Sequence, residues 1–97
     1  AHAAMVYLMT QAEPGVCCPM TMTYAAVPAL RADPALAALW VPRLTAPAHD
    51  PAVAPVAEKR AATMGMAMTE KQGGSDVRAN ATRAEADGEG WRLTGHK

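Results

Sequence analysis

The residues best suited to bind a ligand lie together in the segment 66–76. Gly73 and Gly74 permit backbone conformations with positive φ and allow a ligand to approach the main chain closely. Successive backbone N–H groups in such a loop can bind an anion or a carbonyl oxygen. The hydroxyl groups of Thr69 and Ser75 can donate or accept hydrogen bonds. A planar cofactor that carries oxygens and phosphates would suit this set of groups.

The glycine-containing loop lacks the spacing of the common nucleotide-binding motifs. It has no Gly-Lys-Ser/Thr at the spacing of a P-loop, and it does not follow the G-x-G-x-x-G pattern of dinucleotide-binding folds. An ordinary β-turn loop would have a similar composition. The residues alone therefore leave two interpretations open, a ligand-binding loop and a structural turn.

The other side chains that could react or bind metal have no partners at suitable spacing. Cys17 and Cys18 are adjacent and no clustered ligands accompany them, so we expect buried, structural thiols. The three histidines, which show no zinc-binding spacing, are His2, His49 and His96. The sequence therefore predicts neither a metal site nor a nucleophilic cysteine.

The composition limits the partners and the core of this chain. Its 97 residues carry a formal net charge of zero, and its nine Lys and Arg residues are scattered. It therefore offers no basic surface for phosphate contacts, and an electrostatic hold on DNA would need regions outside this chain. The hydrophobic fraction is 51%, with no Phe and much Ala and Met, so we expect a thin core and marginal stability without partner surface.

The cysteines and the apolar run near the start of the chain bear on the cellular compartment. The two cysteines form no disulfide framework, which is typical of a reducing cytoplasm. The apolar run 3–9 is too short to span a membrane and lacks the pattern of a signal peptide. Both ends look cut, at Ala1 within an apolar run and at Lys97 directly after a predicted strand, which favours an internal fragment.

The first half of the chain predicts helices. Residues 1–12 form the first, with Met5, Leu8 and Met9 on one face, and 13–15 break it. A second helix is predicted from Pro19, kinked or restarted at Pro28. The third starts at the Asp33-Pro34 cap and ends before Pro42.

The second half predicts a connector and then strands. Pro47, Pro51 and Pro55 exclude a continuous helix or a central strand over 46–56. Strands are predicted at 62–69 and 77–87, and a half-buried strand at 91–94 follows a turn at 87–90 with a strong Asp-Gly hairpin signal. Helices followed by strands predict an α+β class or the junction of two domains, with a helical part at 1–45, a Pro-rich connector at 46–60 and a β part at 61–97 that carries the loop.

The alternating methionines of the predicted strand 62–69 form a further candidate group. Met64, Met66 and Met68 recur with period two, which places all three on one face of a strand. A soft metal site is one use for such a face. Packing against a helix or a bound cofactor is the simpler interpretation.

Three segments resemble one known family. Met68-Thr69-Glu70 followed by Gly73-Gly74-Ser75-Asp76 resembles the Thr-Glu…Gly-Ser-Asp signature of acyl-CoA dehydrogenases. Lys71-Gln72-Gly73 looks like the alkylation-response (adaptive response) branch of this family. The commoner members of the family have Pro directly after the Glu that corresponds to Glu70. The runs Cys18-Pro19-Met20-Thr21-Met22-Thr23 and Trp91-Arg92-Leu93-Thr94-Gly95-His96-Lys97 look like segments of the same branch. The resemblance covers essentially the whole chain.

The resemblance implies that 1–45 is the end of an N-terminal helical domain and that 61–97 is the start of an antiparallel, β-barrel-like middle domain. It also implies a set of flavin contacts there. Thr69 would hydrogen-bond the isoalloxazine ring, and Met68 would lie beside it. Ser75 would lie near the flavin phosphates or the thioester ligand, while Gly73 and Gly74 would shape the loop. Met66, on the same strand face as Met68, completes the set of candidate FAD-binding residues.

The resemblance also implies an activity for the parent protein. In the family a glutamate removes the α-proton of an acyl thioester while hydride leaves the β-carbon for flavin N5. That base would lie beyond Lys97, and Glu70 is not assigned the role of the base. This fragment alone should therefore be inactive. A homotetrameric, cytoplasmic FAD enzyme acting on an acyl-CoA-type substrate is therefore expected, with no membrane partner. The alternatives are a flavin-containing, DNA-protective alkylation-response protein with vestigial activity, and a small structural domain without a cofactor.

Overall fold

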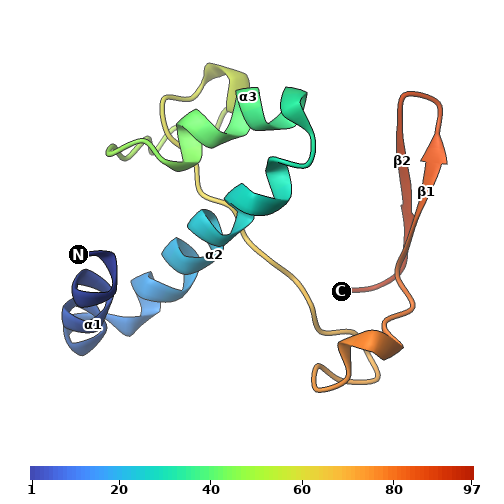
Figure 1. Cartoon of the computed structure of the whole chain (residues 1–97), viewed down its shortest axis with the longest axis horizontal. Coiled ribbons are helices and arrows are strands. Elements are labelled where there is room, and N and C mark those ends of the chain that lie inside the picture. Colours follow the sequence, from blue (N-terminus) through green and yellow to red (C-terminus); the bar gives the residue numbers. More distant parts are fainter. The chain divides into compact units, whose positions relative to one another are not determined.

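The chain is α+β, with three α-helices followed by a two-stranded antiparallel sheet. The computed structural model describes all residues, 1–97, and Figure 1 shows the order of the elements. The chain divides into two compact units, Ala1–Gly65 and Met66–Lys97, each described here by itself. The first unit contains the helices and the second contains the glycine loop and the sheet. The domain limits expected from the sequence stay a prediction.

The first two helices follow each other directly. Helix α1 spans His2–Ala12, as expected, and α2 spans Pro14–Leu30. The prediction that α2 begins at Pro19 is wrong, because the Glu13 carboxylate accepts the Gly15 N–H at 2.7 Å and caps an earlier start. A proline at the first helical position costs no hydrogen bond, since its N–H would be unpaired there anyway.

Helix α3 spans Pro34–Leu44 and confirms the predicted Asp33-Pro34 start. The Asp33 carboxylate accepts the N–H groups of Ala35 and Leu36 at 2.9 and 3.0 Å. The predicted end before Pro42 is wrong. The helices contain three internal prolines, Pro19, Pro28 and Pro42, and all three are exposed. Each proline removes one backbone N–H donor without ending its helix, because water can reach the carbonyl that is left unpaired.

The proline-rich segment 46–60 contains no α-helix or strand, as predicted, and only the short 3-10 helix η1, Val56–Glu58. It is tied to α3 by the Arg43 guanidinium, which donates to the carbonyls of Lys59 and Ala57 at 3.0 Å each. The Asp50 carboxylate accepts the N–H groups of Arg60 and Ala52, and these bonds lower its pKa.

The strand predicted at 62–69 is absent. This segment is irregular and mostly exposed, because no other strand pairs with it. The strand predicted at 77–87 is shorter than expected: the 3-10 helix η2, Val77–Ala79, comes first, and β1 spans only Arg83–Asp87. Strand β2 spans Gly90–Thr94 and confirms the strand expected at 91–94.

Strands β1 and β2 form an antiparallel hairpin with a two-residue loop, since Asp87 pairs with Gly90. Gly88, the first residue of the loop, has φ 63°, the conformation that a type II′ turn requires at this position. Trp91 pairs with Ala86, and Leu93 pairs with Ala84. The apolar side chains therefore share one face. All strand residues are exposed, so the prediction of half-burial is wrong: two strands alone provide no second layer.

The core is thin, as the composition predicts. Leu44 and Ala61 are the buried hydrophobic residues, and Thr23, 2% exposed, is the side chain buried most completely. None of the helices combines the length and apolar character needed to cross a membrane.

Candidate functional site

The candidate loop starts the second unit and closes on itself within four residues. The Gly73 N–H donates to the Glu70 carbonyl at 3.0 Å, and the two residues form an isolated β-bridge. Gly73 has φ 124°, a conformation that other residues rarely adopt. The structure thus places a tight turn where the sequence predicts a glycine-shaped loop.

Gly74 serves a different purpose from Gly73. A Cβ at this position would lie 2.6 Å from the Thr69 hydroxyl oxygen and 3.6 Å from its Cβ and methyl carbon. The space that a side chain would fill is therefore taken by Thr69, which packs against the Gly74 backbone. The group that approaches the Gly74 backbone closely is therefore the Thr69 side chain of the same loop.

The candidate contact residues remain accessible. Met66 and Met68 are 60% and 48% exposed, and Thr69 and Ser75 are also exposed. Hydroxyl groups and flexible thioether side chains thus gather on one loop, and this donor set fits a ring system with polar edges and an apolar face. The structure brings the predicted residues together in one segment, and their contact with a flavin stays a prediction.

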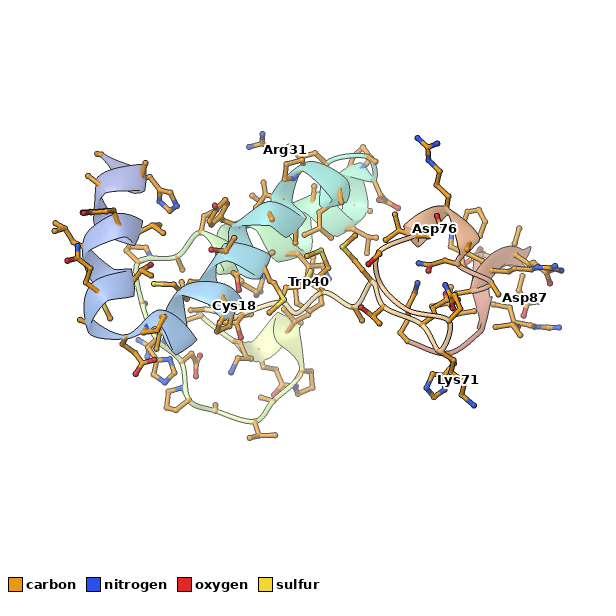
Figure 2. All side chains as sticks on the ribbon, turned by 90° about the horizontal axis from the view of Figure 1, so that it is seen from below. Cys18, Arg31, Trp40, Lys71, Asp76 and Asp87 are labelled. Atoms are coloured by element: carbon orange, nitrogen blue, oxygen red, sulfur yellow. The ribbon has the colours of Figure 1, made fainter.

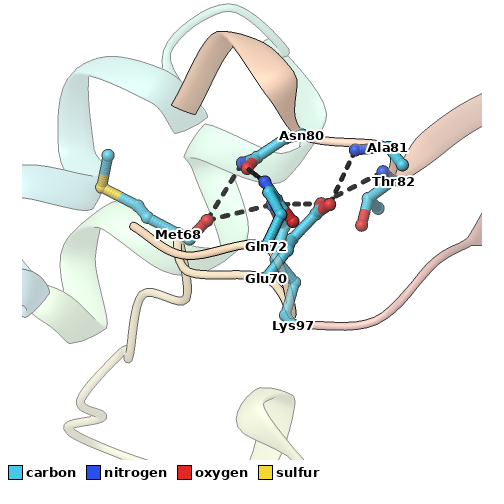
Figure 3. A network of polar contacts seen from close by, with 7 residues as sticks. All are labelled: Met68, Glu70, Gln72, Asn80, Ala81, Thr82 and Lys97. Carbon is cyan, nitrogen blue, oxygen red and sulfur yellow. Dashed lines mark hydrogen bonds and ion pairs between the residues drawn. The ribbon is translucent and has the colours of Figure 1, made fainter. Parts of the chain in front are cut away.

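Glu70 is the centre of a polar network that the sequence did not predict (Figure 3). Its carboxylate accepts the backbone N–H groups of Ala81 at 2.7 Å and Thr82 at 3.1 Å, and pairs with the Lys97 ammonium at 2.9 Å. The Thr82 hydroxyl oxygen is buried beside it without a well-formed hydrogen bond. No short-range pattern identifies these partners, which lie 11 to 27 residues along the chain.

These neighbours fix the charge of Glu70. The Thr82 hydroxyl, the Ala81 N–H and the Lys97 ammonium lower the pKa of Glu70 from an ordinary 4.5 to about 2. A general base works best when its pKa is near the operating pH. Glu70 is therefore a poor proton acceptor near neutral pH.

The Met68 carbonyl forms the second part of the network. It accepts hydrogen bonds from the Asn80 amide at 3.0 Å and from the Lys97 ammonium at 3.3 Å. The Gln72 amide donates to the Asn80 side-chain oxygen at 3.1 Å. The residues on both sides of Thr69 are thus anchored, while Thr69 itself stays exposed.

The remaining reactive residues form no comparable site. Cys17 is half-buried and Cys18 is exposed on α2 (Figure 2), so the prediction of two buried thiols is wrong. Adjacent residues of an α-helix are rotated by about 100°, so the Cys18 side chain points away from that of Cys17. His2 packs its ring edge-on to Tyr24 at a centroid distance of 4.8 Å. No group of three His, Cys, Asp or Glu side chains could hold a metal ion.

An apolar groove of about 570 Å³ lies along α1 and α2. Met5, Leu8 and Met9 line it together, which confirms that they share one helix face, and Met20 and Tyr24 line it from α2. All five side chains are at least 45% exposed. The groove is an uncovered packing surface of the helical unit.

The chain is similar to one known protein family and to a curated protein. The family model described as "Adaptive response protein AidB N-terminal domain" matches residues 1–51. A curated protein from Escherichia coli (strain K12), named "Putative acyl-CoA dehydrogenase AidB", is 48% identical over 99 aligned residues. The alignment covers 100% of this chain and 18% of the length of that protein.

Proposed function

Because the chain belongs to the AidB family, whose N-terminal domain model it matches, we propose that the protein containing it is an FAD-dependent oxidoreductase of the acyl-CoA dehydrogenase type. The relative's name supports a dehydrogenase-like parent. The chain spans only 18% of that relative, so the activity, the acyl-CoA-type substrate, the homotetramer and the cytoplasmic location are proposals for the whole protein.

One observation carries the proposal: Thr69 is exposed between two anchored residues and packs against a glycine backbone. A side chain in this position can present its hydroxyl to a ring edge at little further cost in conformational entropy. Met66 and Met68 would contact the ring, Ser75 would reach the phosphates or the thioester, and Gly73 and Gly74 would set the shape of the loop.

When bound, FAD would supply the two-electron acceptor for α,β-dehydrogenation of an acyl thioester. The residues of this chain would bind and orient it, and none of them removes the α-proton. That step requires a base from another part of the protein. The pKa of Glu70, about 2, makes its carboxylate unsuited to the task.

The description of the matched family supports a second candidate function. It names an adaptive response protein, and the second candidate is a flavin-containing protein that protects DNA and has little dehydrogenase activity. The formal net charge of this chain is zero, so any DNA contact would come from other regions. The proposed connector at 46–60 is compatible with both candidate functions and does not distinguish them.

The visible absorption spectrum of the full-length protein tests the proposal. We expect a flavin spectrum that is weakened in the Thr69→Ala/Ser75→Ala variant. The matched control is Thr10→Ala/Thr45→Ala, which removes two exposed hydroxyls whose bonds, to Val6, Cys17 and Val41, all lie in the helical unit and away from the loop. Bleaching on addition of acyl-CoA would identify a dehydrogenase, and a flavin that stays oxidised would favour the protective protein. A colourless, folded protein that takes up no FAD would refute both.

A further inference from the structure

Glu70 is the only charged residue that is buried in this chain, at 8% exposure. The residues before and after it, Thr69 and Lys71, are exposed. A buried carboxylate is costly unless hydrogen bonds and an opposite charge compensate it. The burial of a carboxylate at this position therefore needs an explanation that the proposed flavin contacts do not supply.

The bonds of Glu70 join three separate parts of the second unit. One carboxylate oxygen accepts the Ala81 N–H, and the other accepts the Thr82 N–H and the Lys97 ammonium. Ala81 and Thr82 directly precede β1, and Lys97 follows β2. The carboxylate thereby ties the turn at 70–73 to both ends of the hairpin.

The hydrogen-bond network around Glu70 also includes the main chain of Met68, the residue before Thr69. Lys97 bridges the Glu70 carboxylate and the Met68 carbonyl, which also accepts a hydrogen bond from Asn80. The Met68 carbonyl and the Glu70 carboxylate, on the two sides of Thr69, thus belong to one network. The Thr69 side chain is left outside the network, exposed and packed against Gly74.

We propose that Glu70 is a positioning residue: its buried carboxylate ties the turn to both ends of the β-hairpin and so holds Thr69 in place to meet the flavin. This inference rests on the proposed function for its flavin contact, while the tie itself is a property of this chain alone. A neutral amide at position 70 has one acceptor oxygen, so it cannot accept both backbone N–H groups and the ammonium as the carboxylate does.

The partners of Glu70 predict a ranking of effects. Loss of the carboxylate leaves a partly buried N–H group without its acceptor, and an unpaired donor is costly to the extent that water cannot reach it. Loss of Lys97 is milder, because its side chain is 30% exposed and water can replace it. In the full-length protein we expect Glu70→Gln to weaken FAD binding about tenfold to a hundredfold, and Lys97→Gln to weaken it about two- to fivefold.

The test combines FAD titration of the full-length protein with hydrogen exchange at the Ala81 and Thr82 amides. The variants are Glu70→Gln, Glu70→Asp, Lys97→Gln and, as the matched control, Glu89→Gln in the exposed hairpin turn. We expect faster exchange at both amides and a shifted flavin absorption band in Glu70→Gln, with partial recovery in Glu70→Asp. Glu89→Gln should behave as wild type.

The outcomes separate this inference from the proposed function. If wild-type protein binds no FAD, the proposed function fails, and exchange at Ala81 and Thr82 still decides whether Glu70 ties the loop. If FAD binds to Glu70→Gln with wild-type affinity and spectrum, the positioning role is overturned, whatever the exchange rates. If Glu70→Gln fails to fold, Glu70→Asp and Lys97→Gln must show the predicted loss of affinity, and wild-type behaviour in both would overturn the proposal.

Discussion

Replacing Thr23 with Val should release the segment that leads to the candidate loop. Thr23 is 2% exposed, and its hydroxyl donates to the Pro19 carbonyl at 2.8 Å while accepting the Met64 N–H at 3.1 Å. Valine has nearly the same shape and the same β-branching, so packing and helix propensity change little. The substitution therefore removes the hydroxyl and little else, and leaves the Met64 N–H without its acceptor.

The size of the effect follows from the orphaned donor. The Met64 N–H is partly buried, and a buried donor without a partner costs about 1–3 kcal/mol, where each 1.4 kcal/mol corresponds to a factor of about ten. Protection of the Met64 amide against hydrogen exchange should therefore fall by about 5- to 150-fold in Thr23→Val. Thr23→Ser keeps the hydroxyl and should retain the protection, although loss of the methyl group costs about 0.8 kcal/mol of burial.

Hydrogen exchange of the Met64 amide in the full-length protein, followed by mass spectrometry or NMR, is the direct assay. Thr10→Val is the matched control, because the Thr10 hydroxyl is exposed and also donates to the carbonyl four residues earlier. Unchanged protection in Thr23→Val would refute the assigned role of the hydroxyl. Equal losses in Thr23→Val and Thr23→Ser would instead trace the effect to packing.

Three further results are expected. Gly74→Ala should weaken FAD binding, since the new Cβ would lie 2.6 Å from the Thr69 hydroxyl oxygen, whereas Gly65→Ala, with nothing within 4 Å, should not. Asp33→Ala should lower the free energy of unfolding by about 0.5–2 kcal/mol through loss of the α3 cap, and Asp33→Asn should retain most of it in urea denaturation. Because the pKa of Glu70 is lowered from 4.5 to about 2, its contribution to stability should be complete above pH 4.5 and be lost as the pH falls towards 2. Acid unfolding of Glu70→Gln should lack this dependence.

The elements that the sequence predicts correctly are those decided by neighbouring residues. Asp33 caps α3 through its own side chain, and Gly88 supplies the positive φ of the hairpin loop. Both signals act within two or three residues, so composition is enough to find them. The α+β class follows from the same local signals.

The wrong predictions concern elements whose limits depend on their surroundings. Pro42 does not end α3, because its position on the exposed side of the helix lets water replace the missing bond. The apolar, alternating run at 62–69 forms no strand, because a strand exists only beside a partner. Neither the exposure of a proline nor the presence of a partner strand can be derived from the local pattern.

The candidate site divides in the same way. The glycine turn was predictable, since Gly73 and the residues around it form a recognisable motif. The bonds from Glu70 to Ala81 and Thr82 were not, because the hydrogen-bonded residues are 11 and 12 positions apart and no periodic element joins them. A local motif therefore reveals the residues that would contact a ligand, but not the distant residues that fix the position of those contact residues.

The way in which this loop is held explains how a chain with so small a core can present a defined site. The large apolar side chains of the second unit are exposed, Trp91 by 71% and Leu93 by 73%, so hydrophobic burial cannot set the geometry of the loop. Hydrogen bonds to one carboxylate and one carbonyl do so instead, and every donor lies between positions 80 and 97. Such bonds are directional and depend on charge. The position of Thr69 should therefore respond to substitution of Glu70, Asn80 or Lys97 far more than to loss of apolar area from the exposed face of the hairpin.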